Sequence, residues 1–236
     1  MTHPKTTGHI ALVGAGPGAR DLLTLRALER IRAADVLLYD RLVDPAIMEL
    51  ARPGAERIYV GKDVGACKWP QGRIDRLIVA KAKLGLRVVR LKSGDPSIFG
   101  RACEEIAAAR AAGIEVEIVP GITAASAAAA SIGRPLTERG ETDTFVITTG
   151  TCKPGDAAPD RARLAHPGTS MAFYMAVERV AQVQADLMDA GAPAACPVEI
   201  VTRASTPEER HVATTLGALS KTIAAEGIAN PAILFI

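Results

Sequence analysis

Short apolar runs rich in Val, Ile and Leu alternate with longer helix-forming runs through the first half of the chain. The strand-like runs lie at residues 9–13, 36–39, 57–60, 86–91 and 116–119. The helix-like runs lie at residues 21–34, 72–84 and 102–112, and an Ala-rich run ends near residue 131. Because such alternation puts a helix between consecutive strands, we expect a mostly parallel sheet with helices on both faces.

A polar segment at residues 133–143, which contains Gly133, Pro135 and Gly140, interrupts this alternation. A second α/β set follows it, with strand-like runs at 144–148, 171–174, 198–201, 209–214 and 232–236 and helix-like runs at 177–190 and 216–226. A chain of 236 residues is long enough for two domains. We therefore predict the α/β class, with mostly parallel sheets in an N-terminal domain at 1–135 and a C-terminal domain at 136–236.

The turn Ser93-Gly94-Asp95-Pro96 lies between a strand-like run and a helix-like run. In an open α/β sheet, ligands bind at the carboxyl ends of the strands. Gly94 lets the backbone approach a ligand closely, and Asp95 offers an acceptor for a ribose hydroxyl or an amine. The same residues also fit an ordinary Asp-Pro turn with no ligand.

Composition excludes several classes of protein. The net charge is +2 with both signs spread along the chain, which is not typical of nucleic-acid binding. The four cysteines form no CxxC pair, so we expect neither a zinc site nor a disulfide framework. The N-terminal residues are polar, and no apolar run is long enough to span a bilayer. These features predict a cytoplasmic protein that binds no metal, nucleic acid or membrane.

Gly14-Ala15-Gly16-Pro17-Gly18 follows a strand-like run, and Asp40 lies about 20 residues downstream, as in dinucleotide-binding folds. Pro17, however, removes a backbone donor from the position where a pyrophosphate would be held. The dinucleotide hypothesis also leaves the Gly94–Asp95 turn unexplained. An NAD-binding protein therefore remains a remote alternative.

Five groups of residues, in this order, carry a resemblance to a known family: Val13–Gly18 with Leu23–Leu25, Tyr39–Val43, Val60–Lys62 with Pro70–Gln71, Arg90–Glu105, and Val119–Ala124 with Arg134–Thr137. Together they resemble the tetrapyrrole methylases, which use S-adenosylmethionine. A weaker match continues through Phe173–Met175 and Pro207–Arg210, so the resemblance covers nearly the whole chain. Tyr39–Val43 points most sharply to the members that act on uroporphyrinogen III.

The resemblance implies a homodimer of two-domain subunits, with the cofactor folded into the cleft between the domains. It implies methyl transfer to C2 and C7 of uroporphyrinogen III, which gives precorrin-2 for sirohaem or cobalamin synthesis. By the same resemblance, Asp40 would be the general base and Lys62 the proton donor. The residues implied to contact S-adenosylmethionine are Pro17, Ser93, Gly94, Asp95, Ile98, Thr123, Ala124, Met175 and Ala204.

Arg41, Arg101 and Arg139 are candidates to hold the carboxylates of the substrate, because a guanidinium binds a carboxylate through two hydrogen bonds. Each residue also has a plainer interpretation. The arginines could be ordinary surface charges, Asp40 could cap a turn, and Lys62 could be a solvated lysine.

The chain departs from the family pattern mainly where substrate would bind. Asp63 stands where the family usually has Arg, and Cys67, Glu138 and Thr151 stand at positions usually occupied by His. Ala204 replaces a usual Gly. These substitutions keep two alternatives open: a methylase of another precorrin or a variant tetrapyrrole, and a non-catalytic paralogue that binds tetrapyrrole.

Overall fold

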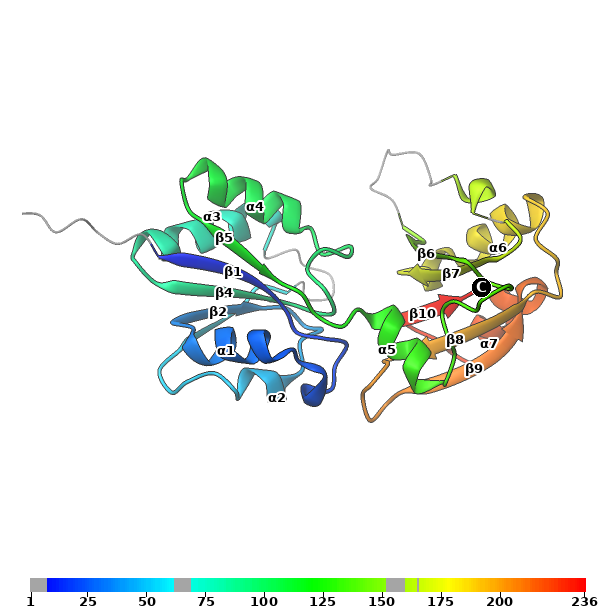
Figure 1. Ribbon diagram of the computed structural model, residues 1–236, viewed down its shortest axis with the longest axis horizontal. Helices are drawn as coiled ribbons and strands as arrows, with labels where there is room; N and C mark the ends of the chain where they lie inside the picture. The colour runs from blue at the N-terminus through cyan, green and yellow to red at the C-terminus, as the bar shows by residue number, and fades with distance from the viewer. Residues whose placement is uncertain (1–7, 62–68, 152–159, 165) are drawn as a thin grey trace, which may run out of the picture. The chain divides into compact units, whose positions relative to one another are not determined.

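The computed structural model describes residues 8–61, 69–151, 160–164 and 166–236 (Figure 1). Contacts divide the chain into two compact units, Met1–Thr123 (unit 1) and Ala124–Ile236 (unit 2). Each unit has its own five-stranded sheet. The predicted α/β class is confirmed. Lys62, Asp63 and Cys67 lie outside the described residues.

The sheet of unit 1 contains only parallel pairs, in the order β3-β2-β4-β1-β5. Its strands are β1 (His9–Gly14), β2 (Val36–Tyr39), β3 (Glu56–Tyr59), β4 (Arg87–Lys92) and β5 (Val116–Val119). Its helices are α1 (Leu25–Ala33), α2 (Pro45–Met48), α3 (Gln71–Lys83) and α4 (Ala102–Ala111). The parallel sheet predicted for the first half of the chain is therefore confirmed.

The connections that leave β1 and β4 run in opposite directions across the sheet. The chain passes from β1 to β2 on the far side of β4, and from β4 to β5 on the far side of β1. Since right-handed crossovers in opposite directions place their helices on opposite faces, α1 and α2 cover one face and α3 and α4 the other (Figure 1). The carboxyl ends of β1 and β4 thus form a topological switch point, where α/β sheets bind ligands.

Helix α1 begins later than predicted. A short 3-10 turn occupies Arg20–Leu22, and the Thr24 side chain accepts a hydrogen bond of 3.1 Å from the amide of Ala27 as the N-cap of α1. Helix α2 was not predicted at all. It is a single turn begun by Pro45, and the Asp44 side chain caps it at the amide of Ala46. A helix this short leaves no periodic apolar pattern in the sequence.

Unit 2 holds a mixed sheet in the order β6-β7-β10-β8-β9. Its strands are β6 (Thr144–Thr149), β7 (Thr169–Tyr174), β8 (Pro197–Thr202), β9 (Arg210–Thr215) and β10 (Ala232–Phe235). Only β6 and β7 pair in parallel; the other three pairs are antiparallel. The prediction of a mostly parallel second sheet is wrong. The link from β8 to β9 contains no helix, so the two strands pair directly as neighbours in opposite directions.

Helices cover both faces of the second sheet (Figure 1). Helix α5 (Ala124–Ser131) packs its alanines against Ile233 and Phe235 on one face. Helices α6 (Val180–Asp189) and α7 (Leu219–Ala225) cover the other. Because α5 packs within unit 2, the division by contacts falls before it, earlier than the expected domain boundary at 135.

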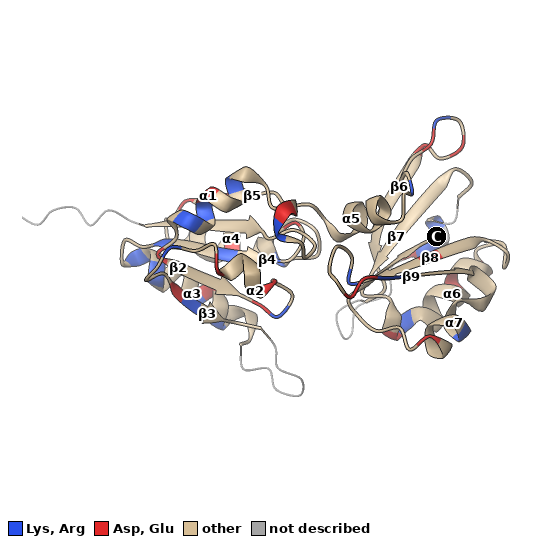
Figure 2. Cartoon of the chain, turned by 90° about the horizontal axis from the view of Figure 1, so that it is seen from below, with Lys and Arg blue, Asp and Glu red and all other residues tan. Residues whose placement is uncertain are grey.

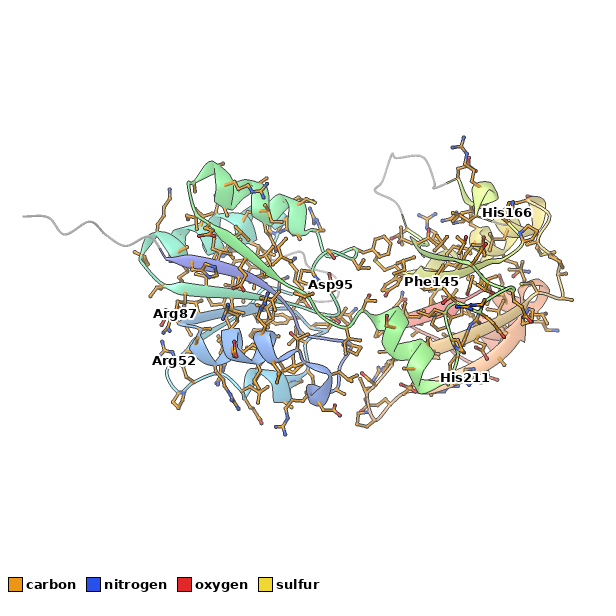
Figure 3. All side chains as sticks on the ribbon, in the orientation of Figure 1. Arg52, Arg87, Asp95, Phe145, His166 and His211 are labelled. Atoms are coloured by element: carbon orange, nitrogen blue, oxygen red, sulfur yellow. The ribbon has the colours of Figure 1, made fainter. Side chains whose placement is uncertain are left out.

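An ion-pair cluster links neighbouring strands at the amino end of the first sheet. Asp35, directly before β2, accepts hydrogen bonds from the Arg87 backbone at 2.7 Å and from its guanidinium at 3.0 Å, and from Arg52 at 2.5 Å. Arg87 is the first residue of β4, so the cluster joins two neighbouring strands. These hydrogen bonds, those from Arg87 foremost, hold the pKa of Asp35 well below its usual range. Figure 3 shows Arg52 and Arg87 at the opposite end of this sheet from Asp95.

We expect Asp35→Asn to lower the free energy of unfolding by about 1 kcal/mol at pH 7, because a charged acceptor is lost. Since the folded pKa of Asp35 is depressed, its stabilisation is present above the unfolded pKa near 4 and is lost as the pH falls further. The difference between wild type and variant should therefore shrink in thermal unfolding below about pH 4.

The matched control is Glu56→Gln. It removes a carboxylate from the exposed Lys81–Glu56 pair on the same unit, along which basic and acidic residues are interspersed (Figure 2). A loss under about 0.5 kcal/mol is expected there. Equal losses in the two variants would contradict the role given to Asp35.

Candidate functional site

Three glycines meet at the carboxyl edge of the first sheet. Gly14 ends β1, Gly94 follows β4, and Gly121 follows β5. A Cβ atom added at Gly121 would lie 2.2 Å from the Gly94 carbonyl oxygen and 2.9 Å from the Gly14 Cα. No side chain fits at that distance, so the backbones of the three loops approach one another as closely as glycine alone permits.

Backbone hydrogen bonds join two of these loops. Gly94 donates its amide to the Gly16 carbonyl at 2.7 Å, and Gly16 donates to the Gly94 carbonyl at 3.3 Å. Both residues have positive φ, 68° at Gly94 and 71° at Gly16. The switch point between β1 and β4 is therefore closed by a rigid backbone bridge.

Asp95 joins the loop after β4 to the loop after β5. Its Oδ2 accepts the Gly121 amide at 3.0 Å, and its Oδ1 accepts the Ser97 amide at 2.7 Å and the Ser97 hydroxyl. Burial acts to raise the pKa of Asp95, but the hydrogen bonds from Ser97 and Gly121 outweigh it, and the pKa is lowered. Because each carboxylate oxygen has two lone pairs, an ionised Asp95 can accept a further donor from a ligand.

Asp40 follows β2 and is partly buried, with 29% of its side chain exposed. Its Oδ1 accepts the Leu42 amide at 3.1 Å, and its Oδ2 lies 3.2 Å from Nη2 of Arg90 on β4. Asp40 therefore does stabilise a turn, as the plainer interpretation of the sequence expected. The contact with Arg90 is additional and fixes the direction of the carboxylate.

A second set of predicted residues meets at one edge of unit 2. Strands β6, β7 and β8 all run toward this edge, because β10 pairs antiparallel with both β7 and β8. Met175 follows β7, and Ala204 follows β8 and packs with Ala125 in one apolar cluster. The Tyr174 hydroxyl accepts the Ala125 amide at 2.8 Å, which fastens the start of α5 to the end of β7. Ala124, Met175 and Ala204 are thus brought to a common edge.

Non-glycine residues with positive φ occur in the same loops. They are Phe99, Arg101, Met175, Arg203 and Ser205. Phe99 and Arg101 follow β4, Met175 follows β7, and Arg203 follows β8. Such conformations cost of order 1–3 kcal/mol each and concentrate at functional sites. In the part of the chain that the structure describes, this strain coincides with the loops that hold the predicted cofactor residues.

The other predicted residues are placed as follows. Pro17 lies between Gly16 and Gly18 after β1, Ser93 and Ile98 lie in the loop after β4, and Thr123 directly precedes α5. Arg41, Arg101 and Arg139 are all exposed, and Arg101 pairs with Glu104 at 2.5 Å. Arg139 lies in the turn between Glu138 and Thr142, whose backbones form a bridge.

The dinucleotide hypothesis does not fit the loop after β1. Nine residues lie between Gly14 and the N-cap Thr24, so no α-helix begins at the glycines to face a pyrophosphate. The amide of Gly16 is already bonded to Gly94. The glycines serve the contact between loops instead.

Sequence reasoning named Gly94 but did not place Gly14 or Gly121 in the site. Each is a glycine at the carboxyl end of a strand, and that position was the available signal. It also missed Arg90, Lys92 and Glu105, which carry charge into the buried layer beneath Asp40. No sequence pattern marks these three as partners.

The parallel sheet with a glycine-lined switch point defines the class of protein: an α/β protein of the kind whose ligands bind at the carboxyl edge of the sheet. The particular family follows from comparison. Residues 9–220 match the tetrapyrrole (corrin/porphyrin) methylases, and the chain belongs to this family. S-adenosylmethionine is the methyl donor of the family.

Known proteins similar to the chain include siroheme synthase of Azotobacter vinelandii, 45% identical over 233 residues, which are 99% of this chain and 50% of that protein. The chain spans about half the length of the curated relatives it matches. A solved uroporphyrin-III C-methyl transferase from Thermus thermophilus, complexed with S-adenosylhomocysteine, is 39% identical, with a TM-score of 0.81 over 97% of this chain and 96% of that one. A cobalt precorrin-4 methyltransferase is 26% identical, with a TM-score of 0.87 over 100% and 97%.

Within the described ranges, no helix is long and apolar enough to cross a membrane. In the same residues, no three His, Cys, Asp or Glu side chains gather in a way that could hold a metal ion.

The residues present fit S-adenosylmethionine. The loops around Gly14, Gly94 and Gly121 pack backbone against backbone, so main-chain atoms form this edge, and the ionised Asp95 beside it suits a cationic, hydroxyl-bearing ligand.

We expect Gly121→Ala to destabilise unit 1 by about 1–3 kcal/mol, because the new methyl group would overlap the Gly94 carbonyl. It should also weaken binding of S-adenosylhomocysteine about tenfold or more, measured by calorimetry, since the loops after β1, β4 and β5 must move apart and shift Asp95. Gly72→Ala is the control: its Cβ would meet only Arg76, at 3.6 Å, and alanine favours helix α3. Unchanged binding in Gly121→Ala would contradict a binding site at these loops.

Proposed function

We propose that this chain transfers methyl groups from S-adenosylmethionine to C2 and C7 of uroporphyrinogen III and so makes precorrin-2. The observation that carries the proposal is the close contact of the Gly14, Gly94 and Gly121 loops at the switch point, where the Asp95 carboxylate accepts the Gly121 amide. The identity to siroheme synthases and to a uroporphyrin-III methyltransferase supports uroporphyrinogen III as the substrate. Precorrin-2 would feed sirohaem or cobalamin synthesis.

In the proposal, residues of both units hold the cofactor. Pro17, Ser93, Gly94, Asp95 and Ile98 belong to unit 1, and Thr123 ends it. Ala124, Met175 and Ala204 belong to unit 2. Asp95 would accept hydrogen bonds from the cofactor's hydroxyl or amino groups, while the glycines let it lie against the backbone. Met175 presents an exposed, polarizable side chain suited to an aromatic ring.

When bound, the cofactor supplies an electrophilic methyl group. The chain's part is to orient that group toward an electron-rich pyrrole carbon and to exclude water, since positioning lowers the barrier of a two-substrate reaction. The methylated ring must then lose a proton. Asp40 is proposed as the base because its carboxylate is partly exposed and held in one direction by Arg90. Lys62 is proposed as the proton donor.

Arg41, Arg101 and Arg139 are proposed to bind the carboxylates of the substrate. All three are exposed cations, and a guanidinium recognises a carboxylate with two parallel hydrogen bonds. Arg101 already forms an ion pair with Glu104, so a substrate carboxylate would have to displace the Glu104 carboxylate. A cytoplasmic homodimer is part of the same proposal, and light scattering in solution would test the dimer.

A methylase of another precorrin is the second candidate. The TM-score of 0.87 to a cobalt precorrin-4 methyltransferase exceeds that of 0.81 to the uroporphyrin-III enzyme. Sequence identity favours uroporphyrinogen III, at 39% against 26%. The two substrates differ in the methyl groups they already carry, so product analysis separates them.

The decisive experiment is an anaerobic assay with uroporphyrinogen III and S-adenosylmethionine, followed by mass and absorbance. We expect a product that carries two added methyl groups. Asp40→Asn should lower kcat by about 100-fold, because the base is lost, while the Kd for S-adenosylhomocysteine stays within about threefold. Cofactor binding without this product would direct the search to other precorrins, or to the non-catalytic paralogue if none reacts. No cofactor binding would overturn the proposal.

A further inference from the structure

Four charged side chains form a partly buried cluster between the first sheet and helix α4. Arg90 and Lys92 lie two residues apart on β4 and therefore face the same side of the sheet, toward α3 and α4. Glu105 lies on α4, and Asp40 follows β2. The exposed fractions of the side chains are 7% for Arg90, 6% for Lys92, 0% for Glu105 and 29% for Asp40. The cluster therefore contains two cations and two anions, and its formal net charge is zero.

Glu105 is the residue that both cations share. Its Oε1 lies 3.3 Å from Nε of Arg90, and its Oε2 lies 2.7 Å from Nζ of Lys92. Gln71, at the start of α3, donates to Oε1 at 3.2 Å and to Asp75 at 2.8 Å. The carboxylate lies in the first turn of α4, where the helix dipole favours negative charge.

Glu105 is linked through its two cations to Asp40 and to the loop after β4, the two parts of the proposed site in unit 1. Arg90 forms the link to Asp40, because its Nη2 lies 3.2 Å from the Asp40 carboxylate. Arg90 also donates to the carbonyls of Leu38 and Leu91, so the guanidinium is fixed from several sides. Lys92 forms the link to the loop that follows β4, because it donates a hydrogen bond to the carbonyl of Gly100.

We propose that Glu105 is a positioning residue, which through Arg90 directs the Asp40 carboxylate and through Lys92 holds the loop between Gly94 and Gly100. The inference rests on the proposed function, since it assigns Asp40 to the reaction. A buried ionic cluster is costly to form, and apolar residues could pack the same space at least as stably. This cluster contacts both the proposed base, Asp40, and the loop that ends at Gly100, so its charges can orient both.

The test replaces the shared carboxylate with its neutral isostere, Glu105→Gln. Removing one anion leaves two cations facing Asp40, with Gln71 and Asp75 the remaining polar neighbours. A neutral side chain at position 105 attracts the Arg90 guanidinium less strongly, so the guanidinium is drawn to Asp40, which changes the direction of the carboxylate. The amide of Leu42, which donates to Asp40, reports that change without any ligand or turnover.

In Glu105→Gln, we expect the Leu42 amide resonance to shift in the ligand-free protein, and S-adenosylhomocysteine to bind three- to tenfold more weakly. At saturating S-adenosylmethionine and a temperature where the variant is folded, kcat should fall about tenfold or more, with the KM for the tetrapyrrole little changed. Added to Asp40→Asn, the same substitution should lower kcat no further, because its effect passes through Asp40. Glu56→Gln is the control, which removes a lysine-paired carboxylate from the surface and should change none of these readouts.

An unchanged Leu42 resonance and unchanged kcat in Glu105→Gln would overturn the inference, and so would full additivity with Asp40→Asn. If Glu105→Gln does not fold, Glu105→Gln/Lys92→Met removes an anion and a cation together and should shift Leu42 in the same way. If the wild type neither binds S-adenosylhomocysteine nor methylates a tetrapyrrole, the proposed function fails by itself. The Leu42 resonance still decides whether Glu105 directs Asp40.

Discussion

The contact among the backbones of Gly14, Gly94 and Gly121 is the constraint on which the site in unit 1 depends. Three parallel strands end at this edge, and their loops can meet only if no Cβ stands between them. Once they meet, Asp95 reaches the Gly121 amide and the two Gly16–Gly94 hydrogen bonds form. A ligand at this edge therefore faces a preformed surface, and the entropy of ordering the loops has been spent on folding rather than on binding.

The strands of both units were predictable from sequence because each contains a short apolar or β-branched run, and turn residues lie between the runs. Their directions were predictable only in unit 1, where a helix-like run follows each strand except β2 and indicates parallel pairing. In unit 2, β8 and β9 are joined by Arg203–Glu209 without a helix, which was a readable sign of an antiparallel pair. The direction of β10 was not readable, since a terminal strand can enter a sheet either way.

Within the site, sequence identified what depends on the backbone and missed what depends on tertiary pairing. Gly94 and Asp95 are recognisable because a strand, a tight turn and a helix follow in order. Arg90 and Lys92 belong to a strand-like run, and Glu105 to a helix with an unremarkable charge pattern. Only the pairing of β2 with β4 brings Arg90 beneath Asp40. Such a cluster is a product of the sheet order, which no local pattern encodes.

The two sides of the proposed site differ in what a substitution can change. The proposed cofactor edge of unit 1 is made largely of main-chain atoms, so exchanging one small side chain for another alters its surface little. The proposed substrate contacts are exposed side chains, Arg41, Arg101 and Arg139, each of which can be replaced without disturbing the fold. Glu138 and Thr151, which depart from the family pattern, are likewise side chains at loop positions. A fold arranged in this way can keep its cofactor while its tetrapyrrole substrate changes, which is why cofactor and substrate must be tested by separate measurements.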